Sequence, residues 1–302
     1  MFTRKWPVEL VCGGQHVVLT GRWLKLLRLR SEFHEPPADP IAFVEAVKRS
    51  GLRADVLTFV QRVQDGAPRF AYRHEFESMA LLRLTTYDDW FTKQLYNKPR
   101  NMIRKAAKSG VEVRLEAFSE PLVRGIKEIY DETPLRQGKR NYHYRESLET
   151  IRETHATFLD RSQFITSYYA GELIGFAKLT FSQDCGILMN FLSRVSHRDK
   201  AVNNALLAKA VEVCAERKVG CLVYGHWGGG GTRGLAEFKA AHGFERVEVP
   251  RYFVPLSAVG KVALTLGAHR GLVHVMPAWL VESAAKARSR WNTMRLGTPK
   301  VD

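Results

Sequence analysis

The amino-acid sequence predicts a mixed α/β (α+β) protein with two domains, each built on a mixed central sheet flanked by helices, and a helical tail. Short apolar segments with partial alternation are separated by segments with helical periodicity, and this order occurs twice. The length of 302 residues favours two domains over one. We place the first domain at residues 1–118, the second at 119–258 and a basic tail at 259–302.

The predicted order in the first domain is strand, helix, strand, strand, helix, strand. Extended segments flank a turn at Gly21, and Asp39 with Pro40 begins a helix that ends before Gly51. Pro99 separates a helix near residues 87–96 from another near 99–109. The segments are, in order, HVVLTGRWLKLLRLRSEF, IAFVEAVKRS, ADVLTFVQRV, ESMALLRL, YDDWFTKQLY, NKPRNMIRKAAKSG and VEVRLEAF.

The second domain repeats this pattern. A helix begins near Pro121, a polar and aromatic loop follows, and a second helix precedes a long β region with a turn at Ala170 and Gly171. The next helix has an apolar face and ends before Gly220. The remaining segments are a buried strand, CLVYG, a short helix, LAEFKAAHG, and a closing strand pair, ERVEVPRYFVPLS.

The composition indicates a folded, basic protein. Lys and Arg number 46 against 31 Asp and Glu, which gives a net charge of +15. Such a charge attracts nucleic acid, nucleotide phosphates or an anionic membrane surface, although a basic surface without a partner is the alternative. The tail carries seven Lys or Arg against Glu282 and Asp302. Both a packed helical tail and a membrane-surface anchor fit this pattern.

The sequence predicts a cytoplasmic protein, with peripheral contact at the inner face of the membrane as a further option. No run of about 18 apolar residues is present, and polar residues interrupt the N-terminal apolar segment. The cysteines do not have the spacing of a zinc or redox motif, so we expect reduced thiols in the core. They are Cys12, Cys185, Cys214 and Cys221.

A glycine-rich stretch, GGGGTRG, spans Gly228 to Gly234. Gly229, Gly231 and Gly234 fit the G-x-G-x-x-G pattern. A dinucleotide-binding fingerprint should lie early in a βαβ unit, with enough chain after it to complete the sheet. Too few strand-like segments follow Gly234, and Leu235 stands where a P-loop needs Ser or Thr. We therefore expect neither a dinucleotide site nor a P-loop here.

Two segments carry resemblances to known families. The order from GELIGFAKLTF to LAEFKAAHGFERVEVPRYFVPL, within about residues 119–256, resembles the end of the GNAT acyltransferase fold. The stretch NKPRNMIRKAAKSGVEVR is similar to a basic helix of Fem-type aminoacyltransferases, which have two GNAT-like domains. The resemblance implies transfer of an acyl group from acyl-CoA or aminoacyl-tRNA onto an amine, with no tightly bound cofactor. It also implies a mobile glycine loop beside the acceptor site.

The sequence departs from GNAT enzymes at two places. Residues 197–204 contain no glycine, although GNAT enzymes have a glycine-rich, pyrophosphate-binding turn before this helix. Arg198 and Lys200 could still bind phosphates, and Asn203 could cap the helix. Lys239 occupies the position of the common GNAT tyrosine, as the F-K pair of Fem-type enzymes does. Binding of CoA is therefore in question.

Candidate site residues follow from these resemblances and from their positions. Lys239 could stabilise an oxyanion or a carrier phosphate, with an exposed helix lysine as the alternative, and His226 could be a base. We find no local signature of a covalent nucleophile and no metal-ligand motif. The predicted catalytic residues are Lys239, His226 and Tyr224; the donor-binding residues are Arg198, Lys200, Asn203, Asn190 and Ser193. The predicted acceptor-binding residues are Arg136, Arg140, Tyr142, Tyr144 and Trp227, and the basic face for tRNA comprises Arg100, Arg104, Lys105 and Lys108.

The acceptor is left open by the sequence. A peptidoglycan precursor, a small amino compound and an amino sugar of a polysaccharide all fit an amine acceptor in cell-envelope or amino-sugar metabolism. The alternative is a protein of another class: a non-catalytic GNAT-like binding module at a membrane surface or on nucleic acid. Substitution of Lys239 or His226 would abolish turnover in the enzyme and spare binding by the module.

Overall fold

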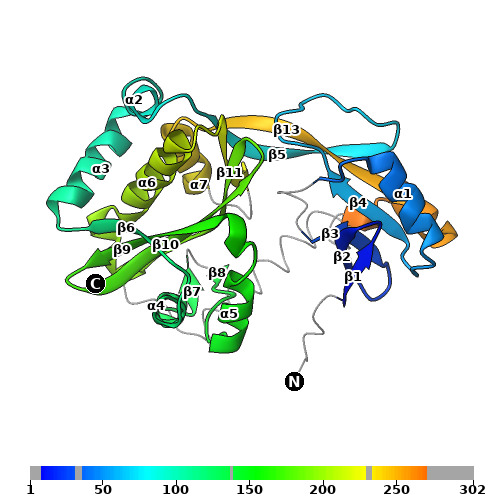
Figure 1. Ribbon diagram of the computed structural model, residues 1–302, viewed down its shortest axis with the longest axis horizontal. Coiled ribbons are helices and arrows are strands. Elements are labelled where there is room, and N and C mark those ends of the chain that lie inside the picture. The colour runs from blue at the N-terminus through cyan, green and yellow to red at the C-terminus, as the bar shows by residue number, and fades with distance from the viewer. Residues whose placement is uncertain (1–7, 31–35, 137–138, 229–232, 271–302) are drawn as a thin grey trace, which may run out of the picture. The chain divides into compact units, whose positions relative to one another are not determined.

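The computed structural model describes residues 8–30, 36–136, 139–228 and 233–270. These residues form a mixed α/β fold and divide into two compact units (Figure 1). Unit 1 comprises the described residues up to Ser78 together with 247–270, and unit 2 comprises those from Met79 to Arg246. The predicted domain boundaries after residues 118 and 258 separate two GNAT-like repeats and a tail. The division into compact units does not test such repeats, so these boundaries stay a prediction.

Unit 1 is a mixed sheet with a helix on each face. Its strand order is β1 (Val8–Cys12), β2 (Gln15–Thr20), β3 (Leu26–Leu29), β4 (Val56–Val60), β13 (Glu245–Pro255) and β5 (Arg73–Arg83), of which the last two also continue into unit 2. The parallel pair β3 and β4 is connected by α1 (Pro40–Arg49). Because side chains alternate along a strand, Tyr252 packs with Phe43 of α1, while Phe253 packs with Leu264 of α8 (Ala258–Thr265).

Unit 2 is also a mixed sheet with helices on both faces. Its strand order is β5, β12 (Cys221–His226), β11 (Cys185–Ser193), β10 (Glu172–Ser182), β9 (Ser162–Tyr169) and β6 (Glu112–Glu116), and only β11 and β12 pair in parallel. α3 (Asn97–Lys108) and α6 (Val202–Glu216) pack together on one face, whereas α4 (Glu120–Asp131) and α5 (Leu148–His155) cover the other (Figure 1). The remaining elements are α2 (Tyr87–Asp89), a π-helical turn at Trp90–Gln94, β7 (Leu135–Arg136), β8 (Lys139–Arg140), α7 (Arg233–Ala241) and short 3₁₀ turns at Leu159–Arg161, Val195–Lys200 and Ala268–Arg270.

The helix starts follow the local sequence. Asp39 accepts hydrogen bonds from the backbone N–H groups of Ile41 and Ala42, and Pro40 is the first helical residue, as predicted. Ser119 and Ser147 cap α4 and α5 in the same way. These caps satisfy N–H groups that lack a partner within the helix. The starts at Pro40 and near Pro121 agree with the prediction.

Three local predictions are wrong. The closing strand pair is one continuous strand, β13, and Pro250 lies within it. The helix predicted over RESLETIRETHATF ends at His155, and Phe158 has a left-handed backbone with φ of 56°. After α6 it is Lys218, and not Gly220, that has a positive φ, 56°. Of the predicted tail, residues 271–302 lie outside the described residues.

The cysteines also differ from the prediction of reduced thiols. Cys185 and Cys221 are register partners on the parallel strands β11 and β12, with their Cα atoms 4.8 Å apart, and their sulfur atoms form a disulfide. Cys12 and Cys214 are free and buried. The sequence could not reveal the pair, because it depends on the register of two strands that lie 36 residues apart in the chain.

Candidate functional site

The centre of the candidate site is the place where β11 and β12 stop pairing. Their register contains only three pairs, from Cys185 with Cys221 to Ile187 with Val223. β11 then continues to Ser193 and β12 to His226 with no ladder between them. On its other side β12 has a register shift between Val223 and His226. An extended ligand can lie between strands that diverge in this way, and sheets place ligands at such ends.

Lys239, His226 and Tyr224 are brought together at this end of β12. Lys239 of α7 is 2% exposed, its Nζ donates a hydrogen bond to the backbone oxygen of His226 at 2.6 Å, and it lies 4.5 Å from the centre of the Tyr224 ring. The alternative of an exposed helix lysine is therefore wrong. Burial lowers the pKa of Lys239 to about 8, so the side chain is mainly a cation at neutral pH.

The environment of Tyr224 connects the two diverging strands. Phe191 of β11 packs edge-on against Tyr224 at 5.2 Å between ring centres, and Phe244 does so at 5.8 Å. Burial raises the pKa of Tyr224, so its hydroxyl stays protonated and can donate a hydrogen bond. Sequence reasoning missed Phe191, although its position directly after Asn190 on the same strand was a usable signal.

A second buried group, His242, fixes the helix that carries Lys239. The His242 ring contacts the backbone oxygen of Phe238 through Nδ1 at 2.7 Å and the Asn204 Oδ1 atom of α6 through Nε2 at 3.0 Å. Trp90 Nε1 donates a hydrogen bond to the backbone oxygen of His242 at 2.9 Å. These contacts attach α7 to α6 and to the π-helical turn, which restricts where Lys239 can lie. The sequence analysis did not identify His242.

The segment before α6 differs from the prediction. α6 begins at Val202, and its N-cap is Ala201 in a left-handed conformation with φ of 56°, so Asn203 does not cap the helix. The Asn203 Oδ1 atom is buried and has no hydrogen-bond partner among the described residues. Arg198 is exposed, whereas Lys200 lies 4.1 Å above the Tyr169 ring. A positive φ is typical of glycine. The turn before α6 therefore adopts a glycine-like conformation at Ala201, although residues 197–204 contain no glycine.

The backbone amides in front of this segment already bind a carboxylate. Glu132 accepts hydrogen bonds from Val195 N at 2.6 Å, from Ser196 N at 2.9 Å and from the Ser196 hydroxyl at 2.7 Å. Burial favours the neutral acid, but the hydrogen bonds from Ser196 and Val195 leave the pKa of Glu132 below its usual value. An external phosphate at these amides would have to displace Glu132. Sequence reasoning missed Glu132, because it lies more than 60 residues away in the chain.

Arg136 belongs to the same cluster. It donates hydrogen bonds to the backbone oxygens of Ser193 at 2.9 Å and Ile129 at 3.2 Å, and it lies 3.4 Å from Glu132. The structure thus brings a predicted acceptor residue, Arg136, beside a predicted donor residue, Ser193. Both are engaged with protein groups. Asn190 is the register partner of Lys178 on β10.

Lys178 is a second buried lysine that has no carboxylate partner in the part of the chain that the structure describes. Its Nζ donates hydrogen bonds to the backbone oxygen of His155 at 2.9 Å and to the hydroxyl of Thr157 at 3.0 Å, and it also contacts the Thr157 backbone oxygen. Burial lowers the pKa of Lys178 to about 8. Lys178 therefore stabilises the end of α5 and gives a natural comparison for Lys239.

The other predicted acceptor residues lie on or after two separate elements of unit 2. Arg140 and Tyr142 are exposed on and after β8, and Tyr144 stacks with Arg145 at 5.2 Å. Trp227 follows β12 directly and packs on the core. Trp227 is also the next residue in the chain after His226, whose backbone oxygen binds Lys239. Residues 229–232 of the glycine stretch lie outside the described residues, so the predicted acceptor loop stays a prediction.

The predicted basic face is carried by α3. Arg100 donates hydrogen bonds to the backbone oxygens of Thr92 and Leu95 and lies 5.7 Å above the Phe91 ring, so it stabilises the π-helical turn. The other three residues, Arg104, Lys105 and Lys108, are exposed. In the described part of the chain, none of these four cations lies within ion-pair distance of a carboxylate. The face is therefore available to an anionic partner.

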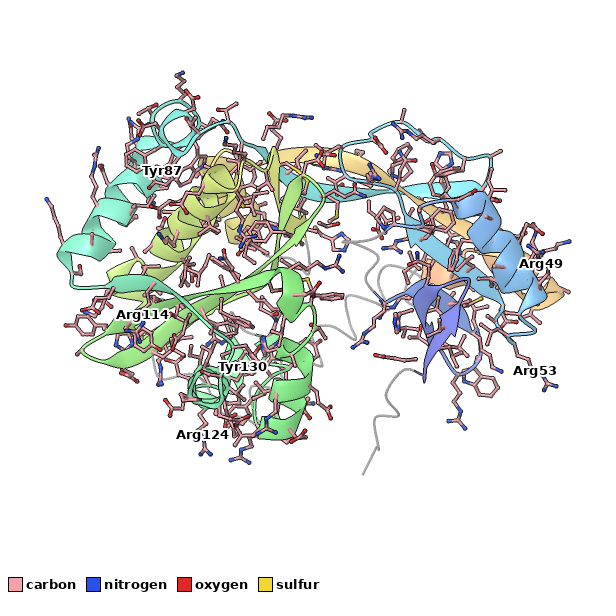
Figure 2. All side chains as sticks on the ribbon, viewed as in Figure 1. Arg49, Arg53, Tyr87, Arg114, Arg124 and Tyr130 are labelled. Carbon is pink, nitrogen blue, oxygen red and sulfur yellow. A yellow bond between two sulfur atoms is a disulfide. The ribbon has the colours of Figure 1, made fainter. Side chains whose placement is uncertain are left out.

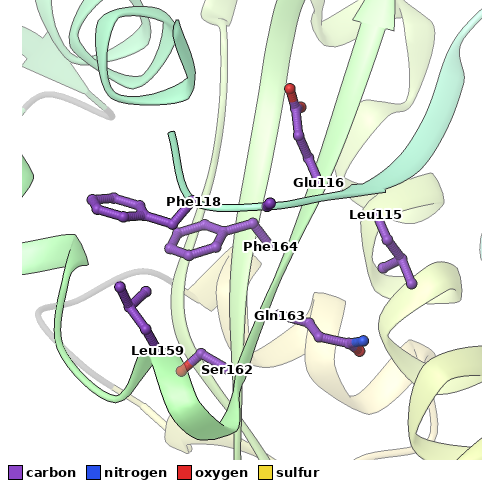
Figure 3. Close-up of a pocket in the computed structure, with 8 residues that line it drawn as sticks. Leu115, Glu116, Phe118, Leu159, Ser162, Gln163 and Phe164 are labelled. Carbon is purple, nitrogen blue, oxygen red and sulfur yellow. The ribbon is translucent and has the colours of Figure 1, made fainter. Parts of the chain in front are cut away.

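Two of the pockets among the described residues are lined by other parts of the chain. One of about 410 Å³ lies beside β6, and Figure 3 shows the rings of Phe118 and Phe164 next to each other in it. The other, of about 840 Å³, lies in unit 1 and is lined by the ion pair of Glu77 with Arg251. Neither pocket contains a predicted site residue.

Comparison with known proteins gives a match at the level of structure alone. No family model and no curated protein matches the sequence. FemX matches with a TM-score of 0.59 at 10% identity, over 78% of this chain and 83% of FemX. The chain has the FemX fold. The predicted resemblance to Fem-type proteins is thus confirmed for the fold.

Two further structures share the FemX fold with this chain. The C-terminal domain of a protein named as a lysylphosphatidylglycerol synthetase, from Agrobacterium fabrum, matches with a TM-score of 0.57 at 14% identity, over 86% of this chain and 87% of that domain. L-PGS from Bacillus licheniformis matches with a TM-score of 0.54 at 13% identity, over 87% and 89%. In the described residues, no helix is both long enough and apolar enough to cross a membrane.

Proposed function

We propose that this protein transfers an aminoacyl group from aminoacyl-tRNA to an amine. The observation that carries the proposal is the buried cation of Lys239, which lies beside Tyr224 where β11 and β12 diverge. The FemX fold supports this assignment, since the names of its relatives include a lysylphosphatidylglycerol synthetase.

The reaction uses Lys239 to stabilise negative charge. The amine nitrogen attacks the ester carbonyl, a C–N bond forms, and the bond to the tRNA oxygen breaks. The amine loses a proton to water or to His226, and the leaving oxygen takes one up. Lys239 has three N–H donors: one binds the His226 oxygen and the Tyr224 ring lies close by, so a further donor can bind the oxyanion. The Tyr224 hydroxyl is a second donor.

Two observations favour tRNA over acyl-CoA as the donor. The amides of Val195 and Ser196 are occupied by Glu132, which disfavours a pyrophosphate at that position. Exposed cations of α3, such as Lys105 and Lys108, have no carboxylate partner in the described part of the chain, which suits a phosphate backbone. In this proposal Arg198 and Lys200 contact the donor and Trp227 the acceptor.

The test is a transfer assay with the full chain, a labelled aminoacyl-tRNA pool and a panel of amines: an amino sugar, a diamine and a peptidoglycan precursor. We expect product that resists mild base, because an amide has replaced an ester. Lys239→Met should lower the rate by about 10²–10³, and Lys178→Met is the matched buried-lysine control. If the protein transfers an acyl group from acetyl-CoA but not from aminoacyl-tRNA, the assignment of the donor is wrong. If transfer is equally fast in Lys239→Met, the proposed role of Lys239 is wrong.

A further inference from the structure

An apolar stripe runs along the outer side of α8 in unit 1. Val259, Val262 and Leu266 are 57%, 59% and 67% exposed, and their spacing places them on one side of the helix. The other side of the helix is packed against the protein. Leu264 is buried, and a Cβ atom on Gly260 would lie 1.9 Å from the backbone oxygen of Asp55. α8 is thus fixed on the sheet with its apolar stripe facing outward.

A turn with an exposed tryptophan lies next to the start of α8. Trp23 is 88% exposed, and the Arg22 guanidinium lies 5.9 Å from its ring centre. The carboxylate of Asp55 accepts hydrogen bonds from Lys25 N at 2.9 Å and from the hydroxyl of Ser257, the N-cap of α8, at 2.7 Å. One side chain therefore holds the turn and the helix together.

The two chain segments that carry these apolar groups have charged side chains of one sign. Residues 21–30 and 256–270 contain Lys and Arg but no Asp or Glu. Arg22, Lys25 and Lys261 have no carboxylate partner in the described part of the chain. Of the acids that contact these segments, Asp55 is hydrogen-bonded to backbone and hydroxyl groups, Glu9 pairs with Arg30, and Glu75 pairs with Arg270. An anionic partner therefore complements this surface.

We propose that this surface, the docking face, binds an anionic lipid bilayer. The docking face comprises Arg22, Trp23, Lys25, Val259, Lys261, Val262 and Leu266. Aliphatic side chains enter the boundary of headgroups and acyl chains, tryptophan lies at the headgroup level, and Lys and Arg contact anionic headgroups. A short apolar helix flanked by a tryptophan and by these cations meets all three requirements. The proposal is independent of the transfer reaction.

Vesicle sedimentation with the full chain tests the docking face. One set of vesicles is phosphatidylcholine alone, and the other contains about 30% phosphatidylglycerol, so that only the second carries the negative surface charge that attracts Lys and Arg. We expect binding to the anionic vesicles that weakens with salt. The Trp23→Ser/Val262→Ser variant should bind at least tenfold more weakly, and so should Lys25→Glu/Lys261→Glu. The controls are on α1: Ile41→Ser, which replaces an aliphatic side chain that is 60% exposed, and Arg49→Glu.

Two results would overturn the proposal. One is equal binding of docking-face and control variants to anionic vesicles. The other is unchanged binding together with a lower thermal stability in Trp23→Ser/Val262→Ser, since that result means that the stripe is covered by protein, such as residues 271–302. Transfer to a soluble amine should be unchanged in every variant, which separates failure of this proposal from failure of the proposed reaction.

Discussion

At the scale of single residues, the position of Lys239 combines burial with a positive charge. A buried lysine without a carboxylate costs folding free energy, because the charged form is poorly solvated. The hydrogen bond to the His226 oxygen offsets part of this cost. Buried cations with a shifted pKa occur at functional sites and also in structural networks, so activity assays must separate Lys239 from Lys178.

The first prediction concerns the pH dependence of transfer. Because the pKa of Lys239 is lowered to about 8, the cation is lost as the pH rises through 8. The ratio of the rate of the unaltered protein to that of Lys239→Met should therefore fall as the pH is raised from about one unit below this pKa to about one unit above it. Single-turnover assays at fixed acceptor concentration measure this ratio. The ratio of the rate of Lys178→Met to that of Lys239→Met should fall over the same pH range, because Lys178→Met retains Lys239. A constant ratio would contradict the assignment.

Glu132 gives a second prediction at the residue scale. Glu132→Ala removes the acceptor of the Val195 and Ser196 amides and should lower the free energy of unfolding by about 1–3 kcal/mol. The same variant should bind inorganic pyrophosphate more tightly, because the amides become available. Urea unfolding and calorimetry measure the two effects. Glu128→Ala, whose carboxylate forms an exposed pair with Arg194, is the control and should cost below about 1 kcal/mol.

At the scale of elements, α3 carries one cation that is engaged with the fold and others that are exposed. Arg100 is engaged with the π-helical turn, whereas Lys105 and Lys108 are exposed. All of these residues lie on α3, and the predicted binding role of this face stays a prediction. The sequence could not show that Arg100 belongs to the fold, because its partners lie in the preceding turn.

The third prediction follows from α3. Lys105→Glu should weaken tRNA binding and reduce the salt slope, log Kd against log salt, by about 0.7–0.9, because the lysine no longer neutralises one phosphate. Arg124→Glu is the matched control; Arg124 is exposed on α4, on the opposite face of the unit 2 sheet (Figure 2). Filter binding at several salt concentrations measures both. Equal slopes for the two variants would show that α3 does not contact the nucleic acid.

Elements with local signals were predictable, and elements set by distant contacts were not. Asp39 and Ser119 mark helix starts through their own side chains. Glu132, by contrast, acts on a segment that reaches it only in the folded chain, and the burial of Lys239 depends on where α7 packs. The residue types at the candidate site could therefore be predicted, but their hydrogen-bond partners could not.

At the scale of the whole molecule, two buried lysines make stability depend on pH in an unusual direction. Lys178 and Lys239 are almost completely buried, and burial lowers the pKa of each from 10.5 to about 8. Between these values the unfolded chain binds more protons than the folded one. The free energy of unfolding contributed by these groups therefore rises with pH above 8.

The fourth prediction is a gain in stability at mildly alkaline pH. From about pH 7.5 to about 9.5, the free energy of unfolding of unit 2 should rise by roughly 1–2 kcal/mol for each lysine. Urea titrations followed by the fluorescence of Trp90, a buried residue of unit 2, measure it. In the double variant Lys178→Met/Lys239→Met, the free energy of unfolding should not show this increase with pH. A decrease over this range in the unaltered protein would contradict the lowered pKa values.

The place of β13 in unit 1 has a consequence for synthesis on the ribosome. β13 pairs with β4 and lies between β4 and β5, yet it is encoded after nearly all of unit 2. A nascent chain that has emerged only through β5 thus exposes an edge of β4, an apolar strand of the kind that pairs with other chains. Unit 1 should therefore close late in translation, and chaperones that shield strand edges should act on the earlier part of the chain.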